Sequence, residues 1–134
     1  LKEWNFGRAT DLAVDDYHRP SLDCELAQRF PDVVQAWRDD AAQLTMPTGE
    51  SLAEFYWRIG EGILSVDREL GRHRSCRVLL VAHGYTGMAL LGSHLGWTYP
   101  DFFKLPLLSP LGLMVLGRSA WNQPSRLLFL GSVA

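Results

Sequence analysis

The clearest candidate for chemistry in this sequence is a histidine placed where an anion could bind. His83 is followed by Gly84 and comes directly after the apolar run Arg77–Ala82. In open α/β sheets, ligands gather beyond the carboxyl ends of the strands, and the N–H groups of a following helix can hold a phosphate. A histidine at a strand end can equally be a hydrogen-bonded core residue. His83 and Gly84 therefore form a candidate anion site, with a structural role as the alternative.

Two glutamates are the next candidates. Glu3 is flanked by Trp4 and Phe6, and a carboxyl group beside aromatic side chains can serve as a general acid. Glu50 lies between Gly49 and the start of a predicted helix. The structural alternative is an exposed residue near a chain end for Glu3 and a helix cap for Glu50. Position alone does not choose between these roles.

The other histidines indicate less. His18 lies in a polar loop, His73 in a basic stretch and His94 near the end of a predicted helix, where a cation suits the helix dipole. No His, Cys and Asp residues have metal-ligand spacing, and no Walker-type loop is present. The sequence therefore predicts neither a metal nor a cofactor.

The composition bounds the class of protein. A chain of 134 residues with 47% hydrophobic and 21% charged residues predicts one domain over residues 1–134. The net charge of −2 gives no sign of binding to nucleic acid or to an anionic membrane. Its longest apolar stretches fall short of the ~20 residues that a spanning helix needs. Two cysteines without a secretory signature favour the cytoplasm and free thiols.

The spacing of apolar residues, together with the positions of Gly, Pro and capping residues, predicts the elements that must position these residues. Leu1–Gly7 is expected to be extended, Arg8–Pro20 irregular and Thr45–Glu50 a loop. Helices are predicted over Ser21–Phe30, Pro31–Leu44, Ser51–Leu70 and Tyr85–Leu95, and strands over Arg77–Ala82, Leu111–Leu116 and Arg126–Leu130, with a turn at Asn122–Pro124.

Two of these predictions have specific signals. Ser51 and Glu54 have the spacing of a capping box, followed by an apolar stripe of helical period. The uninterrupted run Arg77–Ala82 is typical of a strand buried on both faces of a parallel sheet. The order of elements predicts a layered α/β/α domain with a mostly parallel central sheet. That strand needs a neighbour, which we expect to lie upstream of Leu1.

Read together, these segments resemble the histidine phosphatase superfamily, also called phosphoglycerate mutase-like. Leu1–Gly7 is similar to its L-x-E-x-x-F-G segment, and Pro47–Ser51, followed by Phe55 and Arg58, is similar to its P-x-G-E-S…R stretch. Val78–Gly84 is similar to its second-histidine motif at a strand end. The three motifs occur in the family's order and cover nearly the whole chain.

The resemblance implies a mechanism and a role for each matched residue. In the family, a first histidine becomes a phosphohistidine, and a second histidine holds the phosphoryl oxygens. A carboxylic acid protonates the leaving oxygen, and water then releases phosphate. By motif, His83 would be the second histidine and Glu3 the proton donor. Glu50 and Gly84 would support substrate binding, and Arg58 would be mainly structural.

The sequence also departs from the family's pattern, and these departures bear on whether this chain can be active. The R-H-G motif with the nucleophilic histidine is absent, and Arg8–Thr10 and Tyr85–Gly87 are atypical. Because the chain begins with Leu1 and inside a motif, we interpret it as the C-terminal two-thirds of the domain. Alone, such a chain is expected to be inactive and to aggregate, to form a homodimer through its unpaired sheet edge or to be marginally folded. The expected substrate is a small phosphorylated molecule.

Two alternatives remain open. The chain could be a non-catalytic, phosphatase-like domain that binds a phosphorylated ligand or a protein. It could also be an α/β-hydrolase with His83–Gly87 as its oxyanion-hole turn, although Gly92–Gly96 has the wrong spacing for the nucleophile elbow and no strand precedes it.

Overall fold

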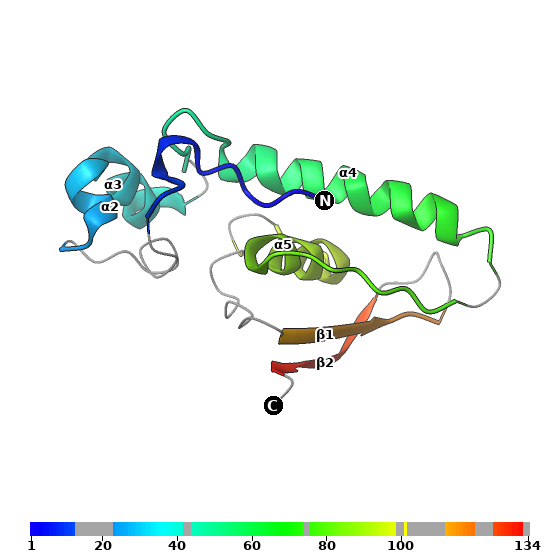
Figure 1. The fold of residues 1–134 in the computed structure, drawn as a ribbon. Helices are drawn as coiled ribbons and strands as arrows, with labels where there is room; N and C mark the ends of the chain where they lie inside the picture. The colour runs from blue at the N-terminus through cyan, green and yellow to red at the C-terminus, as the bar shows by residue number, and fades with distance from the viewer. Residues whose placement is uncertain are drawn as a thin grey trace. The chain divides into compact units, whose positions relative to one another are not determined.

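The structure is a computed structural model that describes residues 1–12, 23–41, 44–73, 76–98, 101, 112–119 and 125–132. Figure 1 draws these residues as a coloured ribbon. The chain divides into two compact units. The inserted unit is Trp4–Tyr56, and the main unit joins Leu1–Glu3 to Trp57–Ala134.

The inserted unit begins with a short turn and two helices. The 3-10 turn η1 covers Gly7–Ala9, α2 covers Glu25–Arg29 and α3 covers Pro31–Asp40. The predicted first helix is shorter than expected: its predicted cap Ser21 lies outside the described residues, and Cys24 caps α2 through its Sγ atom. Helix α3 begins at the predicted Pro31, where the missing N–H costs nothing, and ends four residues before the predicted Leu44.

Aromatic side chains form the core of the inserted unit. Trp4 is only 2% exposed, and its ring stacks on Phe55 with a centroid distance of 5.6 Å. Trp37 and Phe6 contact the same indole at 6.5 and 5.3 Å. The aromatic residues that flank Glu3 in the sequence therefore anchor the opening segment in this core.

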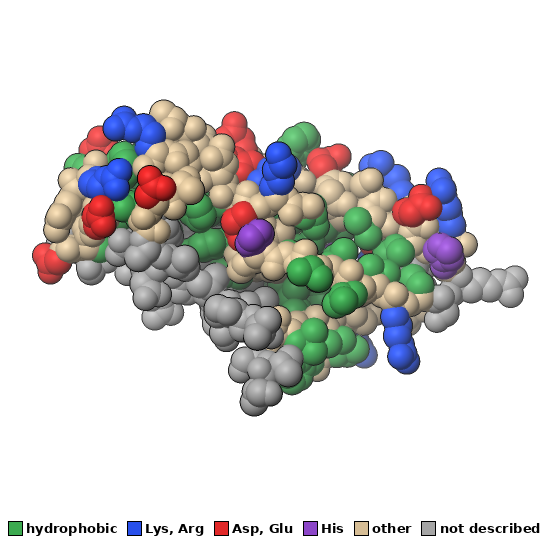
Figure 2. Space-filling model, in the orientation of Figure 1, with side chains coloured by type: hydrophobic (Ala, Val, Ile, Leu, Met, Phe, Trp, Pro, Cys, Tyr) green, Lys and Arg blue, Asp and Glu red, His purple; other side chains and the backbone are tan. Residues whose placement is uncertain are grey.

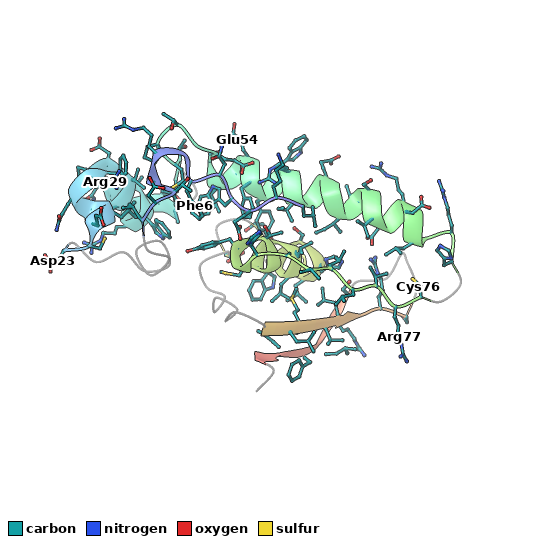
Figure 3. The ribbon with its side chains drawn as sticks, viewed as in Figure 1. Phe6, Asp23, Arg29, Glu54, Cys76 and Arg77 are labelled. Carbon is teal, nitrogen blue, oxygen red and sulfur yellow. The ribbon has the colours of Figure 1, made fainter. Side chains whose placement is uncertain are left out.

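Helix α4, Leu52–Leu70, confirms both signals predicted for it. The Ser51 N–H and hydroxyl donate to Glu54 Oε2 at 2.8 and 2.7 Å, and the Glu54 N–H donates to Ser51 Oγ at 3.2 Å. This is a complete capping box, and Glu54 lies over the first turn of the helix (Figure 3). The two Ser51 donors hold the pKa of the Glu54 carboxyl below its ordinary value. The apolar stripe is buried at Leu52, Phe55, Ile59 and Ile63.

The main unit contains α5 and a β-hairpin. Helix α5 covers Gly84–Leu95, and strands β1, Gly112–Gly117, and β2, Arg126–Ser132, pair antiparallel. The register shifts after Val115, which pairs with Phe129 while Leu116 pairs with Leu127. Both strands lie where the sequence predicted them, and their predicted turn at Asn122–Pro124 lies outside the described residues.

Contacts between elements hold the main unit together. Helix α5 packs against β2. Arg118, the residue after β1, forms a half-buried ion pair with Asp67 of α4. The hairpin is thus held by the packing of α5 against β2 and by the ion pair that follows the end of β1.

The predicted buried strand Arg77–Ala82 is not observed. These residues form no strand, and Leu79 and Val81 are 81% and 90% exposed. The segment begins at Arg77, which follows Cys76 (Figure 3). Hydrophobic side chains are visible on the face of the molecule that Figure 2 shows. A strand is buried only when neighbouring strands pair with it, and no described residue does so. The parallel sheet predicted around it is likewise not seen among the described residues, whose sheet is the antiparallel hairpin.

None of the described helices is long and apolar enough to cross a membrane.

Candidate active site

The carboxylate of Glu3 lies at the N-terminal end of α5. Its Oε1 accepts hydrogen bonds from the Thr86 backbone N–H at 3.1 Å and from the Thr86 hydroxyl at 3.3 Å. The N-terminus of a helix carries partial positive charge and favours an anion. Although 83 residues separate them in sequence, Glu3 and Thr86 are therefore direct partners.

His83 is the residue that caps this same end of α5. Its backbone is extended, its carbonyl accepts the Gly87 N–H at 2.8 Å, and its side chain is exposed and makes no capping bond. Gly84 is the first residue of the helix. The structure thus brings Glu3, His83 and Gly84 to one end of one helix.

This geometry changes one expectation about the anion site. The helix N–H groups after His83 were expected to point at a phosphate, but the Thr86 N–H is already bound to Glu3. A phosphate at this helix end would have to use other donors, such as the His83 ring.

Two side chains hold the backbone of Glu3 in place. The Arg58 guanidinium donates to the carbonyls of Lys2 and Glu3 at 3.1 and 3.2 Å. The Thr86 hydroxyl also lies 3.1 Å from the Lys2 carbonyl oxygen. Both of these Arg58 contacts are to backbone oxygens, and the mainly structural role expected for Arg58 stays a prediction.

Glu50 joins the opening segment to the Pro47–Ser51 loop within the inserted unit. Its N–H donates to the Asn5 carbonyl at 2.9 Å, and its carbonyl accepts the Trp4 indole N–H at 3.0 Å. Its carboxylate accepts the Asn5 N–H at 3.4 Å. Glu50 therefore fixes a residue two positions after Glu3, and its role in substrate binding stays a prediction.

Two glycines allow these segments to approach so closely. Gly7 has a φ of +54°, and a Cβ atom there would lie 2.1 Å from the Pro47 carbonyl oxygen. A Cβ on Gly49 would lie 2.3 Å from the Asn5 carbonyl oxygen. The glycines of the two motifs face each other because the two backbones leave no room for a side chain.

Thr86 was not among the candidate residues predicted from the sequence, where Tyr85–Gly87 departs from the family's pattern. In the structure, Thr86 is fully buried and contacts both Lys2 and Glu3. A usable signal was present: a threonine in the first turn of a helix can bind a polar group that approaches the helix end.

The part of the chain that the structure describes contains no group of three or more His, Cys, Asp or Glu residues that could hold a metal ion.

Comparison with known families decides the fold family. The model of the histidine phosphatase superfamily, branch 1, matches residues 1–126. The chain belongs to this superfamily. Its fold is accordingly the mixed α/β fold of the phosphoglycerate mutase-like proteins.

A solved structure supports the same histidine phosphatase fold. The chain is similar to a mycobacterial glucosyl-3-phosphoglycerate phosphatase complexed with VO3, with a TM-score of 0.62 and 19% identity. The match covers 81% of this chain and 55% of that one, so this chain spans about half the length of its structural relative. No curated protein matches the sequence.

Membership in the histidine phosphatase superfamily also rules out the α/β-hydrolase interpretation. Gly92–Leu95 lies inside α5 and not on a strand-to-helix elbow. The His83–Gly87 segment is the cap and first turn of a helix whose N-terminus binds a carboxylate.

Proposed function

We propose that this chain supplies the proton donor and a phosphate-binding histidine of a phosphoric monoester hydrolase or phosphomutase. The observation that carries the proposal is the meeting of Glu3 and His83 at one end of α5 in a member of the histidine phosphatase superfamily. Phosphoryl transfer needs hydrogen-bond donors around the phosphoryl oxygens and an acid at the leaving oxygen, and these two residue types supply them.

In the proposed reaction, a histidine nitrogen on a segment upstream of Leu1 attacks phosphorus. The bond from phosphorus to the ester oxygen breaks, and that oxygen keeps the electron pair and takes the proton of Glu3. Water then attacks the phosphohistidine and gives a proton to the Glu3 carboxylate, while the histidine nitrogen leaves with its electron pair. His83 donates a hydrogen bond to the phosphoryl oxygens in both steps. In a phosphomutase, a substrate hydroxyl replaces water in the second step.

The nucleophile is assigned upstream because none of the four histidines of this chain lies in an R-H-G motif. We infer that the substrate is a small phosphate ester in the cytoplasm, where the two free thiols of Cys24 and Cys76 would persist. The structural relative acts on a phosphorylated glucosyl glycerate, which makes a phosphate ester of a small polar alcohol the first substrate class to test. We also propose that the protein forms a homodimer.

The competing hypothesis is a non-catalytic domain that binds a phosphorylated ligand. Reading the coding sequence upstream of Leu1 distinguishes the two. An R-H-G motif within ~80 residues, the span that completes a domain of ordinary size, supports the enzyme. Its absence supports the binding domain.

His83→Ala tests the phosphate-binding role in the enzyme extended upstream. We expect the rate on an aryl phosphate to fall by ~10²–10³-fold, the scale for removing one donor to a transferring group. His94→Ala is the matched control, because His94 lies at the opposite end of α5 with its Nδ1 atom 2.9 Å from the Leu90 carbonyl oxygen. The 134-residue chain alone should show no turnover. Turnover by this chain, or an enzyme indifferent to His83→Ala, would overturn the mechanism.

Glu3→Gln tests the proton donor. The loss of rate should be larger on alkyl phosphates than on aryl phosphates, because an acid matters most when the departing oxygen is basic. Glu61→Gln, at an exposed position of α4, is the control for loss of a carboxylate. Equal losses on both substrates would remove Glu3 from this role.

A further inference from the structure

The Thr86 side chain has one hydroxyl proton and two acceptors for it. Its Oγ1 atom lies 3.1 Å from the Lys2 carbonyl oxygen and 3.3 Å from Glu3 Oε1. A threonine hydroxyl donates one hydrogen bond at a time and rotates to choose its acceptor. Thr86 is fully buried, so water does not compete for this proton.

A proton donor must be stable both with and without its proton. Hydrogen bonds donated to a carboxylate favour the ionised form, which works against an acid that has to be reprotonated in each cycle. The Thr86 backbone N–H cannot turn away from Glu3, whereas the hydroxyl can. With Glu3 ionised, the hydroxyl donates to Oε1. With Glu3 protonated, it donates to the Lys2 carbonyl, and no buried donor is left without an acceptor.

We infer that Thr86 is the positioning residue of the acid, and that its hydroxyl changes acceptor from Glu3 to Lys2 when Glu3 takes up a proton. The inference rests on the proposed role of Glu3. Arg58 keeps the second acceptor in place, because its guanidinium binds the same Lys2 carbonyl from α4. The charged side chain that these contacts bring to the arrangement is the Arg58 guanidinium, which binds the carbonyls of Lys2 and Glu3.

The test in the extended enzyme compares leaving groups. Thr86→Val keeps the size of the side chain and removes the hydroxyl. We expect an alkyl phosphate to lose ~10-fold to 100-fold in rate, the scale of one hydrogen bond to a charged group, and an aryl phosphate to lose less than about threefold. Thr86→Ser should restore the alkyl rate. Thr98→Val is the matched control, since it removes an exposed hydroxyl that binds Asp101 at 2.9 Å.

A double variant separates this inference from the proposed function. In a Glu3→Gln background, Thr86→Val should leave the ratio of alkyl to aryl rates unchanged, because Thr86 acts only through the acid. If Glu3→Gln itself leaves that ratio unchanged, the proposed function fails. If Glu3→Gln lowers it while Thr86→Val matches Thr98→Val, the inference fails. The aryl rate reports whether each variant is folded, and Thr86→Ala replaces Thr86→Val if the latter is not.

One further measurement on the extended protein needs no catalysis. The amide proton signal of Thr86 should shift in Glu3→Gln, because a neutral amide is a weaker hydrogen-bond acceptor than a carboxylate. Glu61→Gln should leave the signal in place, since Glu61 lies at an exposed position of α4. A Thr86 amide signal that ignores Glu3→Gln would overturn the contact and the inference with it.

Discussion

A methyl group added at Gly7 should destabilise the contact between the Leu1–Gly7 segment and the Pro47–Ser51 loop. In Gly7→Ala, the new Cβ would lie 2.1 Å from the Pro47 carbonyl oxygen and 2.5 Å from the Gly49 nitrogen. Both are backbone atoms, so no side chain can rotate away. The φ of +54° adds a second cost, because residues with a Cβ atom rarely adopt this conformation.

The two costs can be estimated separately. A left-handed backbone costs about 1–2 kcal/mol for a residue other than glycine, and forcing an extra carbon into a packed site costs about 1–3 kcal/mol. We therefore expect Gly7→Ala to lower the free energy of unfolding by about 2–5 kcal/mol, a large part of the ~5–15 kcal/mol of an ordinary domain.

Gly60→Ala is the matched control. Gly60 lies inside α4, and a Cβ there would meet no atom within 4 Å. The same substitution should raise stability by about 1 kcal/mol, since alanine favours a helix and narrows the unfolded ensemble.

Urea denaturation of the protein extended upstream of Leu1, followed by circular dichroism, measures both changes as shifts of the midpoint at constant slope. Equal stability of Gly7→Ala and the parent chain, or opposite signs to those expected for the two variants, would refute the close approach of the Gly7 and Pro47–Gly49 backbones.

Two further variants test helix α4, which begins just after the Pro47–Gly49 segment. Glu54→Gln should destabilise the chain at neutral pH, because the Glu54 pKa is lowered from its ordinary value of 4.5 by the Ser51 hydrogen bonds. A carboxyl group whose pKa is lower in the folded state than in the unfolded state stabilises the fold at pH values above its unfolded pKa. That stabilisation is lost as the pH falls through its folded pKa. The gap in thermal midpoint between parent and variant should therefore close in acid, and a gap that is constant with pH would contradict the capping box. Phe55→Ala should cost about 3–5 kcal/mol, since it empties a fully buried site and removes the ring stacked on Trp4. The same variant should change tryptophan fluorescence, and an unaltered spectrum would contradict the stacking.

Elements defined by neighbours in sequence were predictable. The capping box of α4 depends on Ser51 and Glu54, three residues apart, and its geometry follows from helix periodicity. The helix after His83 begins at Gly84, one residue before the predicted start, and both hairpin strands lie where short apolar runs indicated them. In each case, the sequence signal and the hydrogen bonds it produces lie within one element.

Features that depend on distant residues were not predictable. An apolar run such as Val78–Val81 shows that a segment can be buried, but burial needs strands that pair with it. Thr86 contacts Lys2 and Glu3, which lie 84 and 83 residues away in the sequence, so no local pattern could indicate these contacts. The motifs identified Glu3 and His83 as parts of one site, and the structure places both at one end of α5. The prediction that residues 1–134 form a single domain stays a prediction.

The course of the chain through the two units has an evolutionary consequence. The chain leaves the main unit after Glu3 and returns at Trp57, and the Arg58 fork ties these two points together through the carbonyls of Lys2 and Glu3. The entropy of closing a loop grows only slowly with its length. Residues between these points can therefore lengthen, shorten or exchange sequence while Glu3 keeps its hydrogen bonds to Thr86. Evolution of the Trp4–Tyr56 segment is thus separated from the contacts that hold Glu3 in place.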